Sequence, residues 1–154
     1  MQEMRRKDRQ GTREDAERIL RKETFGVLST AAMEGYPYGV PINYYYEDGC
    51  IYIHAARNAG KKIAAMRKDP HVCFTVCTDV KLRPEAFTTR FQSVICFGTA
   101  AELEGEAKRK ALQGMIRSLT PDFVEAGLAY VDKALDAVSV FCIHIDHMTA
   151  KIHD

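Results

Sequence analysis

The sequence predicts a mainly β fold, an antiparallel barrel with helices packed on its outside. Short stretches rich in β-branched and aromatic residues follow one another as consecutive hairpins, and Asp48–Gly49 between two of them is a tight-turn signal. The helical segments do not alternate regularly with the strands, as they would in a parallel sheet. The pattern indicates about six or seven strands and three or four helices.

The N-terminal half is expected to contain one helix and three strands. Thr12 followed by Asp15 is a capping-box pattern that begins a helix over residues 13–23. Its apolar stripe consists of Ala16, Ile19 and Leu20. The strands are expected at residues 24–31, 38–47 and 50–55. Pro41 has no backbone N–H to donate, so the second strand should lie at a sheet edge or contain a bulge.

The C-terminal half is expected to alternate less regularly between strands and helices. A helix opens after Gly60 and stops before Pro70. Strands follow at 71–78, 89–104 and 137–146, with a loop over 79–87, a helix within 105–121 and irregular helix over 121–134. Gly98 indicates a bulge or bend in the long strand.

The bulk properties favour a single domain over residues 1–154, in which residues 1–11 form an N-terminal arm that is flexible or contacts a partner. The formal net charge of +1 gives no overall field that would attract nucleic acid or a membrane surface. The sequence contains neither an apolar stretch of roughly 18 residues nor a signal-peptide core. Five cysteines, an odd number lying mostly in apolar strand-like stretches, indicate free thiols in a reducing cytoplasm.

Residues 53–66, "IHAARNAGKKIAAM", predict an anion site at the mouth of a helix. A helix N-terminus offers free N–H groups and the positive end of its dipole, and Gly60 permits close backbone approach. Lys61 and Lys62 add positive charge in the first turn, where it is unfavourable unless an anion compensates it. The alternative is that both lysines are simply solvated.

Three further positions could carry chemistry. His54 ends a strand, and it is either a hydrogen-bonded rim residue or a ring beside a cofactor that exchanges protons near neutral pH. Asn43 can donate to the edge of a heterocycle, although packing is the simpler role of the tyrosines that follow it. Arg90 can pair with a phosphate, and a surface arginine is the alternative.

The C-terminal histidines do not predict a metal site. His144 and Asp146 share one strand face, whereas His147 points to the other, so the ligands do not converge and we expect no metal. Nucleophile-elbow and zinc-protease motifs are absent from the sequence.

Over roughly residues 5–150 the chain resembles the FMN-binding split-barrel family related to pyridoxamine 5′-phosphate oxidase, in particular its nitroimidazole-resistance branch. The motifs that carry the resemblance are "GVLST" at Gly26–Thr30, "GYPYGVPI" at Gly35–Ile42, "IYIH" at Ile51–His54, "RKDPHVCF" at Arg67–Phe74 and "SVICFGTA" at Ser93–Ala100. The resemblance implies a six-stranded antiparallel split β-barrel that forms a homodimer, with FMN in a groove at the subunit interface.

The resemblance also implies roles for individual residues. Lys62 matches the phosphate-binding lysine, but the loop before it is one residue longer than expected, so Lys61 is an alternative. His54 matches a histidine regarded as functionally important. The other positions matched to the flavin site are Pro41, Ile42, Asn43, Ala55, Ala56, Arg90, Phe91, Gln92 and Ser93.

The expected activity is that of an FMN-dependent oxidoreductase. It would pass electrons from reduced flavin to a small planar acceptor such as a nitroaromatic compound, with His54 as proton donor or substrate contact. The alternatives are a non-catalytic flavin-binding protein and a heme-binding split barrel that uses His54 or a C-terminal histidine.

Overall fold

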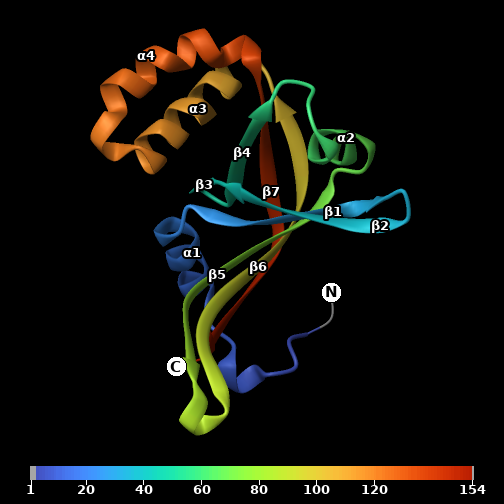
Figure 1. Ribbon diagram of the computed structural model, residues 1–154, viewed down its shortest axis with the longest axis vertical. Coiled ribbons are helices and arrows are strands. Elements are labelled where there is room, and N and C mark those ends of the chain that lie inside the picture. The colour runs from blue at the N-terminus through green and yellow to red at the C-terminus, as the bar shows by residue number, and fades with distance from the viewer. Residues whose placement is uncertain (1–2, 154) are drawn as a thin grey trace.

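The computed structural model describes residues 3–153 and is organised around one seven-stranded antiparallel sheet (Figure 1). The strands are β1 (Phe25–Met33), β2 (Tyr36–Asn43), β3 (Tyr45–Glu47), β4 (Cys50–Ala56), β5 (His71–Arg83), β6 (Thr88–Leu103) and β7 (Val138–His153). The helices are α1 (Arg13–Lys22), α2 (Lys61–Lys68), α3 (Gly105–Leu119) and α4 (Val124–Ala134). The strand order is β2-β1-β5-β6-β7-β4-β3, and the predicted antiparallel split-barrel fold is confirmed.

The sheet has seven strands rather than six because the expected strand over 38–47 breaks at Tyr44. The first part, β2, pairs with β1, and the second part, β3, pairs with β4 at the other end of the strand order. At the break the Tyr44 side chain is fully buried, and its hydroxyl donates to the carbonyl of Leu20 at 3.0 Å. Pro41 lies in an edge strand, as its missing N–H requires.

Two strands extend further than the sequence pattern predicts. The expected loop over 79–87 continues β5 as far as Arg83, and a short 3₁₀ turn at Pro84–Ala86 then leads into β6. The strand expected to end at residue 146 continues to His153, and it pairs with β6 from Val140 to His153. The added part of β5 is exposed on both faces, so no burial against the core marks it as a strand. The added part of β7 does alternate, because Met148, Ala150 and Ile152 pack against the main core, and the sequence analysis missed this pattern.

The bulge expected at Gly98 is present in the pairing of β6 with β7. The register shifts between Phe97 and Gly98. A Cβ atom at Gly98 would lie 2.3 Å from the carbonyl oxygen of His144, so only glycine fits without moving the backbone.

The main hydrophobic core lies between α1 and the inner face of the sheet. The expected stripe of α1 is buried there, and the capping box between Thr12 and Asp15 is formed. Tyr44 and Phe74 meet edge to face in this core, with ring centroids 5.0 Å apart. Before α1, the Gly11 N–H donates to Ala150 on β7, which ties this part of the N-terminal arm to the sheet.

A second apolar cluster lies on the opposite face of β4 and β7, where the α3–α4 hairpin covers the sheet (Figure 1). Its buried members are Ala111, Leu112, Met115, Val131 and Val140. Along β4, Ile51 and Ile53 point into the main core, whereas Tyr52 points toward α3. Because strand side chains alternate, His54 lies on the same face as Tyr52, toward the α3–α4 hairpin.

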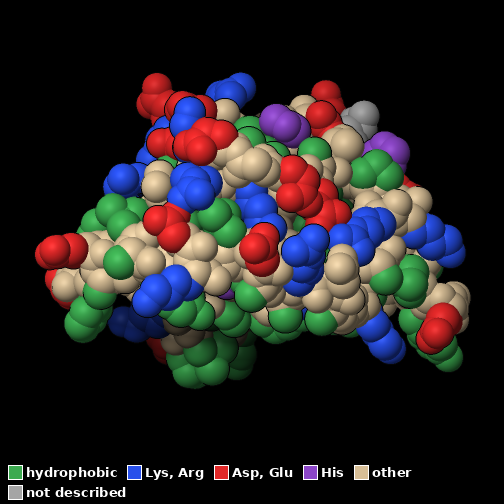
Figure 2. Space-filling view, turned by 90° about the horizontal axis from the view of Figure 1, so that it is seen from above, with side chains coloured by type: hydrophobic (Ala, Val, Ile, Leu, Met, Phe, Trp, Pro, Cys, Tyr) green, Lys and Arg blue, Asp and Glu red, His purple; other side chains and the backbone are tan. Residues whose placement is uncertain are grey.

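The surface at the end of the molecule that carries α3 and α4 has a mixed charge. Figure 2 shows basic and acidic side chains interspersed over this view, in keeping with the net charge of +1. Among residues 3–153, none of the helices has the length and apolar character needed to cross a bilayer.

Candidate functional site

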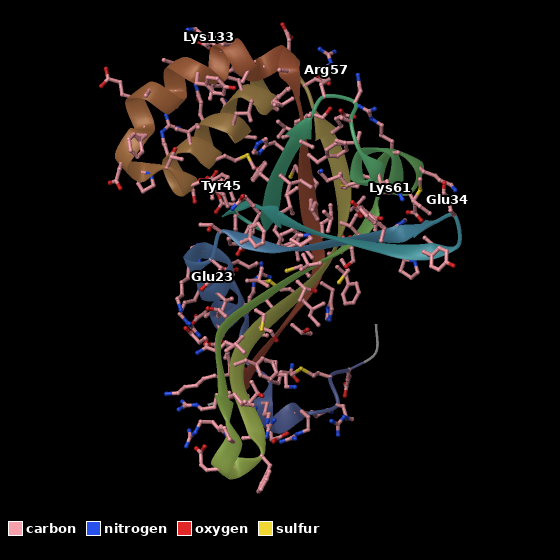
Figure 3. All side chains as sticks on the ribbon, in the orientation of Figure 1. Glu23, Glu34, Tyr45, Arg57, Lys61 and Lys133 are labelled. Carbon is pink, nitrogen blue, oxygen red and sulfur yellow. The ribbon has the colours of Figure 1, made fainter. Side chains whose placement is uncertain are left out.

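The end of β4 and the start of α2 form a positively charged corner. After Ala56 the chain turns through residues 57–60, and Gly60 takes the N-cap position of α2 with φ +87°. Neither a side-chain cap at Gly60 nor an acidic residue in the first turn of α2 is present. The N–H groups at the start of the helix therefore lie beside Lys61 and Lys62, and Figure 3 shows Lys61 at this position.

The two lysines differ in their environment. Lys61 is exposed, whereas Lys62 is half-buried. The Lys62 ammonium turns back toward the loop, so that its Nζ lies 4.0 Å from where a Cβ atom on Gly60 would be. Its charge also acts on His54. Lys62 is thus the lysine that shares a site with His54.

His54 has a lowered pKa for two reasons. Desolvation by the surrounding protein is the larger cause, and the positive charge of Lys62 is the second. Both disfavour the imidazolium form, so the ring is neutral at pH 7. His54 can therefore exchange hydrogen bonds with a ligand, but it does not hold the extra proton of a general acid at neutral pH.

An apolar pocket of about 210 Å³ adjoins His54 between the sheet and the α3–α4 hairpin. Besides His54, its wall is formed by Leu112, Met115, Ile116, Leu119, Thr120, Tyr130, Val131, Ala134 and Val138. Because nearly all of these side chains are aliphatic or aromatic, the pocket suits an apolar, poorly hydrated group. The helical periodicity of α3 indicates only a buried face, so the sequence carried no signal for this pocket.

The other predicted residues near the strand ends are distributed between two parts of the sheet. Ala55 and Ala56 continue β4 beside His54. Pro41, Ile42 and Asn43 lie on β2, which is not adjacent to β4. The Asn43 side chain donates to the Thr24 carbonyl at 3.1 Å, so this donor is used within the chain.

The predicted segment from Arg90 to Ser93 lies elsewhere, near the β5–β6 hairpin. Phe91 pairs with His153, whereas His54 pairs with Val140, so the two groups lie near opposite ends of β7. A pocket of about 290 Å³ is lined there by Asp79, Lys81, Arg90, Phe91, Gln92 and His153. Within one chain, the structure does not bring this segment to the Lys62 corner.

His153, one of the C-terminal histidines that the sequence offered only as a metal or heme ligand, lines this second pocket. Its Nδ1 atom is buried and has no hydrogen-bond partner within the described part of the chain. Gln92, in contrast, accepts a hydrogen bond from Arg18 at 3.1 Å. An unpaired buried nitrogen beside a pocket is a ready contact for a polar ligand group.

The comparisons with known proteins identify the family to which this fold belongs. The sequence pattern of the family described as pyridoxamine 5′-phosphate oxidase matches residues 12–152. A candidate 5-nitroimidazole antibiotic resistance protein from Bacteroides thetaiotaomicron is 30% identical, with a TM-score of 0.78. That alignment covers 92% of this chain and 84% of the other. A search of curated protein sequences found no match.

More distant structures share the fold alone. An FAD-binding protein from Mesorhizobium loti is 24% identical with a TM-score of 0.66, over 95% of this chain and 96% of the other. A protein from Mycobacterium smegmatis that binds FAD and heme is 19% identical with a TM-score of 0.83, over 95% of this chain and 74% of the other. Since the family pattern spans nearly the whole barrel, the chain belongs to the pyridoxamine 5′-phosphate oxidase family of flavin-binding split barrels.

Proposed function

We propose that this protein is an FMN-dependent oxidoreductase that passes electrons from reduced flavin to a small planar acceptor, such as a nitroaromatic compound. The observation that carries the proposal is that four features lie close together at the end of β4. The uncapped N-terminus of α2 and the half-buried Lys62 lie there beside His54 and an apolar pocket. One end of this site suits an anion, and the other suits a flat ring.

The corner at Gly60 fits the phosphate group of FMN. A phosphate monoester carries about two negative charges at neutral pH, and a helix N-terminus supplies N–H donors and a favourable dipole for it. The positive φ of Gly60 is strained for other residues. Lys62 then adds a charge that no acidic residue of the first turn neutralises. The same features would also bind the diphosphate of FAD, so the choice of FMN over FAD is itself part of the proposal.

When bound, FMN supplies the electron transfer. The protein's own residues hold the phosphate at Lys62, exclude water through the side chains that line the pocket, and present a neutral His54. A neutral imidazole can donate one hydrogen bond and accept another, which suits the orientation of a polar acceptor group. The preference for a nitroaromatic acceptor is supported by the similarity to the Bacteroides protein.

We further propose that the working form is a homodimer with the flavin at the interface. Phe25, Val27, Ile95 and Phe97 are large apolar side chains exposed on one face of the sheet. Val27 pairs with Thr75, and Thr75 pairs with Ile95, so these residues form a continuous row across β1, β5 and β6. An exposed apolar surface of this kind is typical of an interface.

A dimer would also explain why the predicted flavin residues form two separate groups within one chain. The pocket containing Arg90, Gln92 and His153 lies far along β7 from Lys62. In a symmetric pair, this pocket of one chain can complete the Lys62 corner of the other.

The absorbance spectrum of the untagged protein, followed by a turnover assay, tests this function. We expect a yellow protein with flavin bands that oxidises NADH or NADPH when a nitroaromatic acceptor is present. A yellow protein without turnover across a panel of acceptors would identify a flavin-binding protein instead. A Soret band would identify the heme-binding alternative, and a colourless protein that does not retain added FMN would contradict the proposal. A cytoplasmic location remains a prediction.

A further inference from the structure

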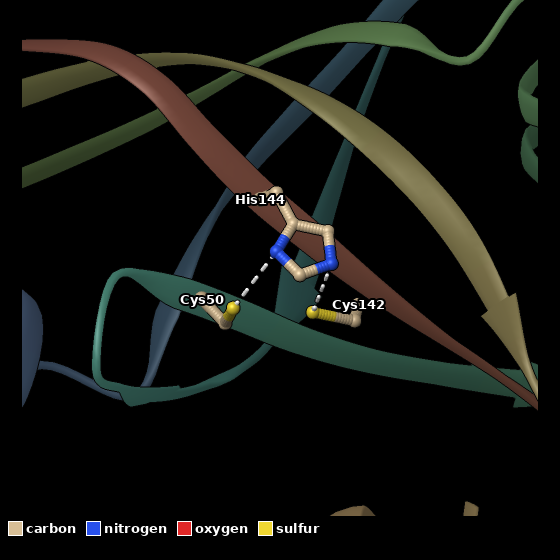
Figure 4. Close-up of side chains that lie close together, drawn as sticks. All are labelled: Cys50, Cys142 and His144. Atoms are coloured by element: carbon tan, nitrogen blue, oxygen red, sulfur yellow. Dashed lines mark hydrogen bonds between the residues drawn. The ribbon is translucent and has the colours of Figure 1, made fainter. Parts of the chain in front are cut away.

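Two cysteines and a histidine converge on the outer face of β4 and β7, close to α3 (Figure 4). Cys50 lies directly across from His144 in the strand pairing, and its Sγ is 3.3 Å from His144 Nδ1. Cys142 precedes His144 by two residues on the same face, with its Sγ 3.8 Å from Nε2. One ligand atom from each residue can be chosen so that all three lie within 4.8 Å of one another.

The two sulfurs contact different nitrogens of the His144 ring, and only one of these nitrogens can bind a given ion, so the separation that matters for a metal site is the 4.8 Å limit. Bond lengths of about 2.3 Å to sulfur and 2.0–2.1 Å to nitrogen place neighbouring ligand atoms about 3.6–3.8 Å apart around a tetrahedral ion. Side-chain rotations that shorten the separations from within 4.8 Å to this range would bring the two sulfurs and one ring nitrogen into position. The backbone is held by the β4–β7 pairing, so the three residues are already arranged by the sheet.

We propose that Cys50, Cys142 and His144 bind a Zn²⁺ ion. Two thiolates and an imidazole are a ligand set that zinc prefers, and on binding each thiol releases its proton to solvent as a zinc–sulfur bond forms. The site is independent of the proposed flavin corner. Cys50 and His54 share a face of β4 but lie four residues apart, roughly 13 Å along an extended strand.

The fourth coordination position faces a cavity. A cavity of about 340 Å³ adjoins the site and is lined by Cys142 and His144 together with Glu47, Tyr52 and Lys110. His144 itself is exposed, so solvent reaches this side of the cluster. Three protein ligands with an open fourth position can take a water molecule from this side.

The strand register favours metal binding over a disulfide. Cys50 faces His144 and Cys142 faces Tyr52, so the two cysteines are diagonal rather than directly opposed. Diagonal neighbours in an antiparallel pair are about 7–8 Å apart, beyond the roughly 4.4–6.8 Å between Cα atoms that a disulfide needs. A metal ion bound between the two sulfurs can link residues whose Cα atoms are this far apart, so the backbone does not have to move.

Cobalt titration of the reduced, metal-free protein tests the site, because Co²⁺ reports its ligands in the visible and near-ultraviolet spectrum. We expect one equivalent of Co²⁺ to give tetrahedral d–d bands and a thiolate charge-transfer band, and Zn²⁺ to displace it. Cys50→Ser and Cys142→Ser should each diminish the charge-transfer band. His144→Gln should keep that band but bind Zn²⁺ more weakly, by at least the roughly 10–100-fold that loss of an outer-shell partner costs. Cys77→Ser, at an exposed cysteine outside the cluster, is the matched control and should change nothing.

Alkylation mapping provides a second measurement that needs no variant. In the folded wild-type protein, Zn²⁺ should protect the half-buried Cys50 from iodoacetamide while the exposed Cys77 stays reactive. Cys142 is 3% exposed and is shielded with or without the metal, so Cys50 is the reporter. X-ray absorption at the zinc edge should show two sulfur ligands. The proposal is overturned if Co²⁺ gives no thiolate band with reduced wild-type protein. It is also overturned if the double variant lacking both thiols keeps the full spectrum, or if Zn²⁺ leaves the alkylation of Cys50 unchanged.

Discussion

His54 is held in its neutral form by its surroundings, and this determines what it can do in a reaction. Desolvation is the larger cause of its lowered pKa and the charge of Lys62 is the second. A phosphate bound at Lys62 would cancel the second cause and leave the first. In the free protein His54 is therefore better suited to orient a substrate than to act as an acid. Of the two roles expected from the sequence, this favours the substrate contact over the proton donor.

The lowered pKa of His54 can be tested through Lys62. Lys62→Met removes the positive charge while keeping much of the aliphatic stem, so the His54 pKa should rise toward its usual value near 6.5 without reaching it. The ring signals of His54 in an NMR pH titration measure this directly, with His54→Gln to assign them. An unchanged His54 titration in Lys62→Met would contradict the electrostatic contact between the two residues.

The same pKa has a consequence for stability against pH. Because the folded state binds the proton on His54 less tightly than the unfolded state does, protonation favours unfolding. The contribution of His54 is fully present above about pH 6.5 and is lost as the pH falls through the lowered folded-state pKa. Urea unfolding at several pH values should show a smaller loss of stability below pH 6.5 in His54→Gln than in the wild type.

Lys62 is the residue on which flavin retention should depend most. Loss of a charge-assisted hydrogen bond to phosphate costs about 1.5–3 kcal/mol, so Lys62→Ala should weaken FMN binding by about 10- to 100-fold. Lys68→Ala, at an exposed lysine in the last turn of the same helix, is the control. Fluorescence titration with FMN measures both variants. Equal FMN affinities in the two variants would count against Lys62 as the phosphate-binding residue. A large loss of affinity only in Lys61→Ala would instead identify Lys61 as that residue.

At the scale of elements, α1 connects local sequence signals to the main core. Its capping box begins the helix at Thr12, and its apolar stripe packs against the inner face of the sheet. The Leu20 carbonyl near its C-terminal end accepts the hydroxyl of Tyr44 at the break between β2 and β3. The helix thus stabilises the point where the chain passes from one end of the strand order to the other.

The contribution of the cap can be measured by substitution. Thr12→Ala removes the side-chain oxygen that accepts the Asp15 N–H at 3.1 Å, and we expect it to lower the free energy of unfolding by about 1 kcal/mol. Thr12→Ser keeps the oxygen and should stay within about 0.5 kcal/mol of the wild type. Urea denaturation distinguishes the two variants. If both were equally stable, the capping box would contribute nothing in this protein.

For the whole molecule, the exposed apolar face and the divided flavin site both lead to the same proposal of a homodimer. Phe97→Glu places a charge on the exposed apolar face of the sheet, at a side chain that is 39% exposed. It should shift the protein from dimer to monomer and lower its FMN affinity, because a charge buried at an interface is costly. Phe123→Glu, at a side chain that is 70% exposed near α4, is the matched control.

Sedimentation velocity at micromolar concentration measures the oligomeric state of both variants, and far-ultraviolet circular dichroism confirms that they are folded. A wild-type protein that sediments as a monomer and still binds FMN tightly would contradict the dimer proposal. If Phe97→Glu remained a dimer, the interface would have to lie on another surface of the protein.

Sequence patterns predicted the features that neighbouring residues decide. The cap at Thr12 and the hairpin at Asp48–Gly49 are set within a few positions of the chain. Pro41 at an edge and the bulge at Gly98 follow from one residue's backbone chemistry. The corner at Gly60 to Lys62 was recognisable for the same reason, since a glycine followed by two lysines at a helix start is a local pattern.

Tertiary structure alone decided which distant residues meet. The sequence pattern could not say whether Lys61 or Lys62 lies beside His54. That depends on the position of α2 relative to β4. Cys50 and His144 are 94 positions apart and converge only because β4 pairs with β7 in one particular register. The break at Tyr44 and the pocket under α3 likewise arise from packing between separate elements. Hydrogen bonding and conformational preference act locally and are visible in the sequence, whereas the burial of side chains against distant partners is settled only when the whole sheet has formed.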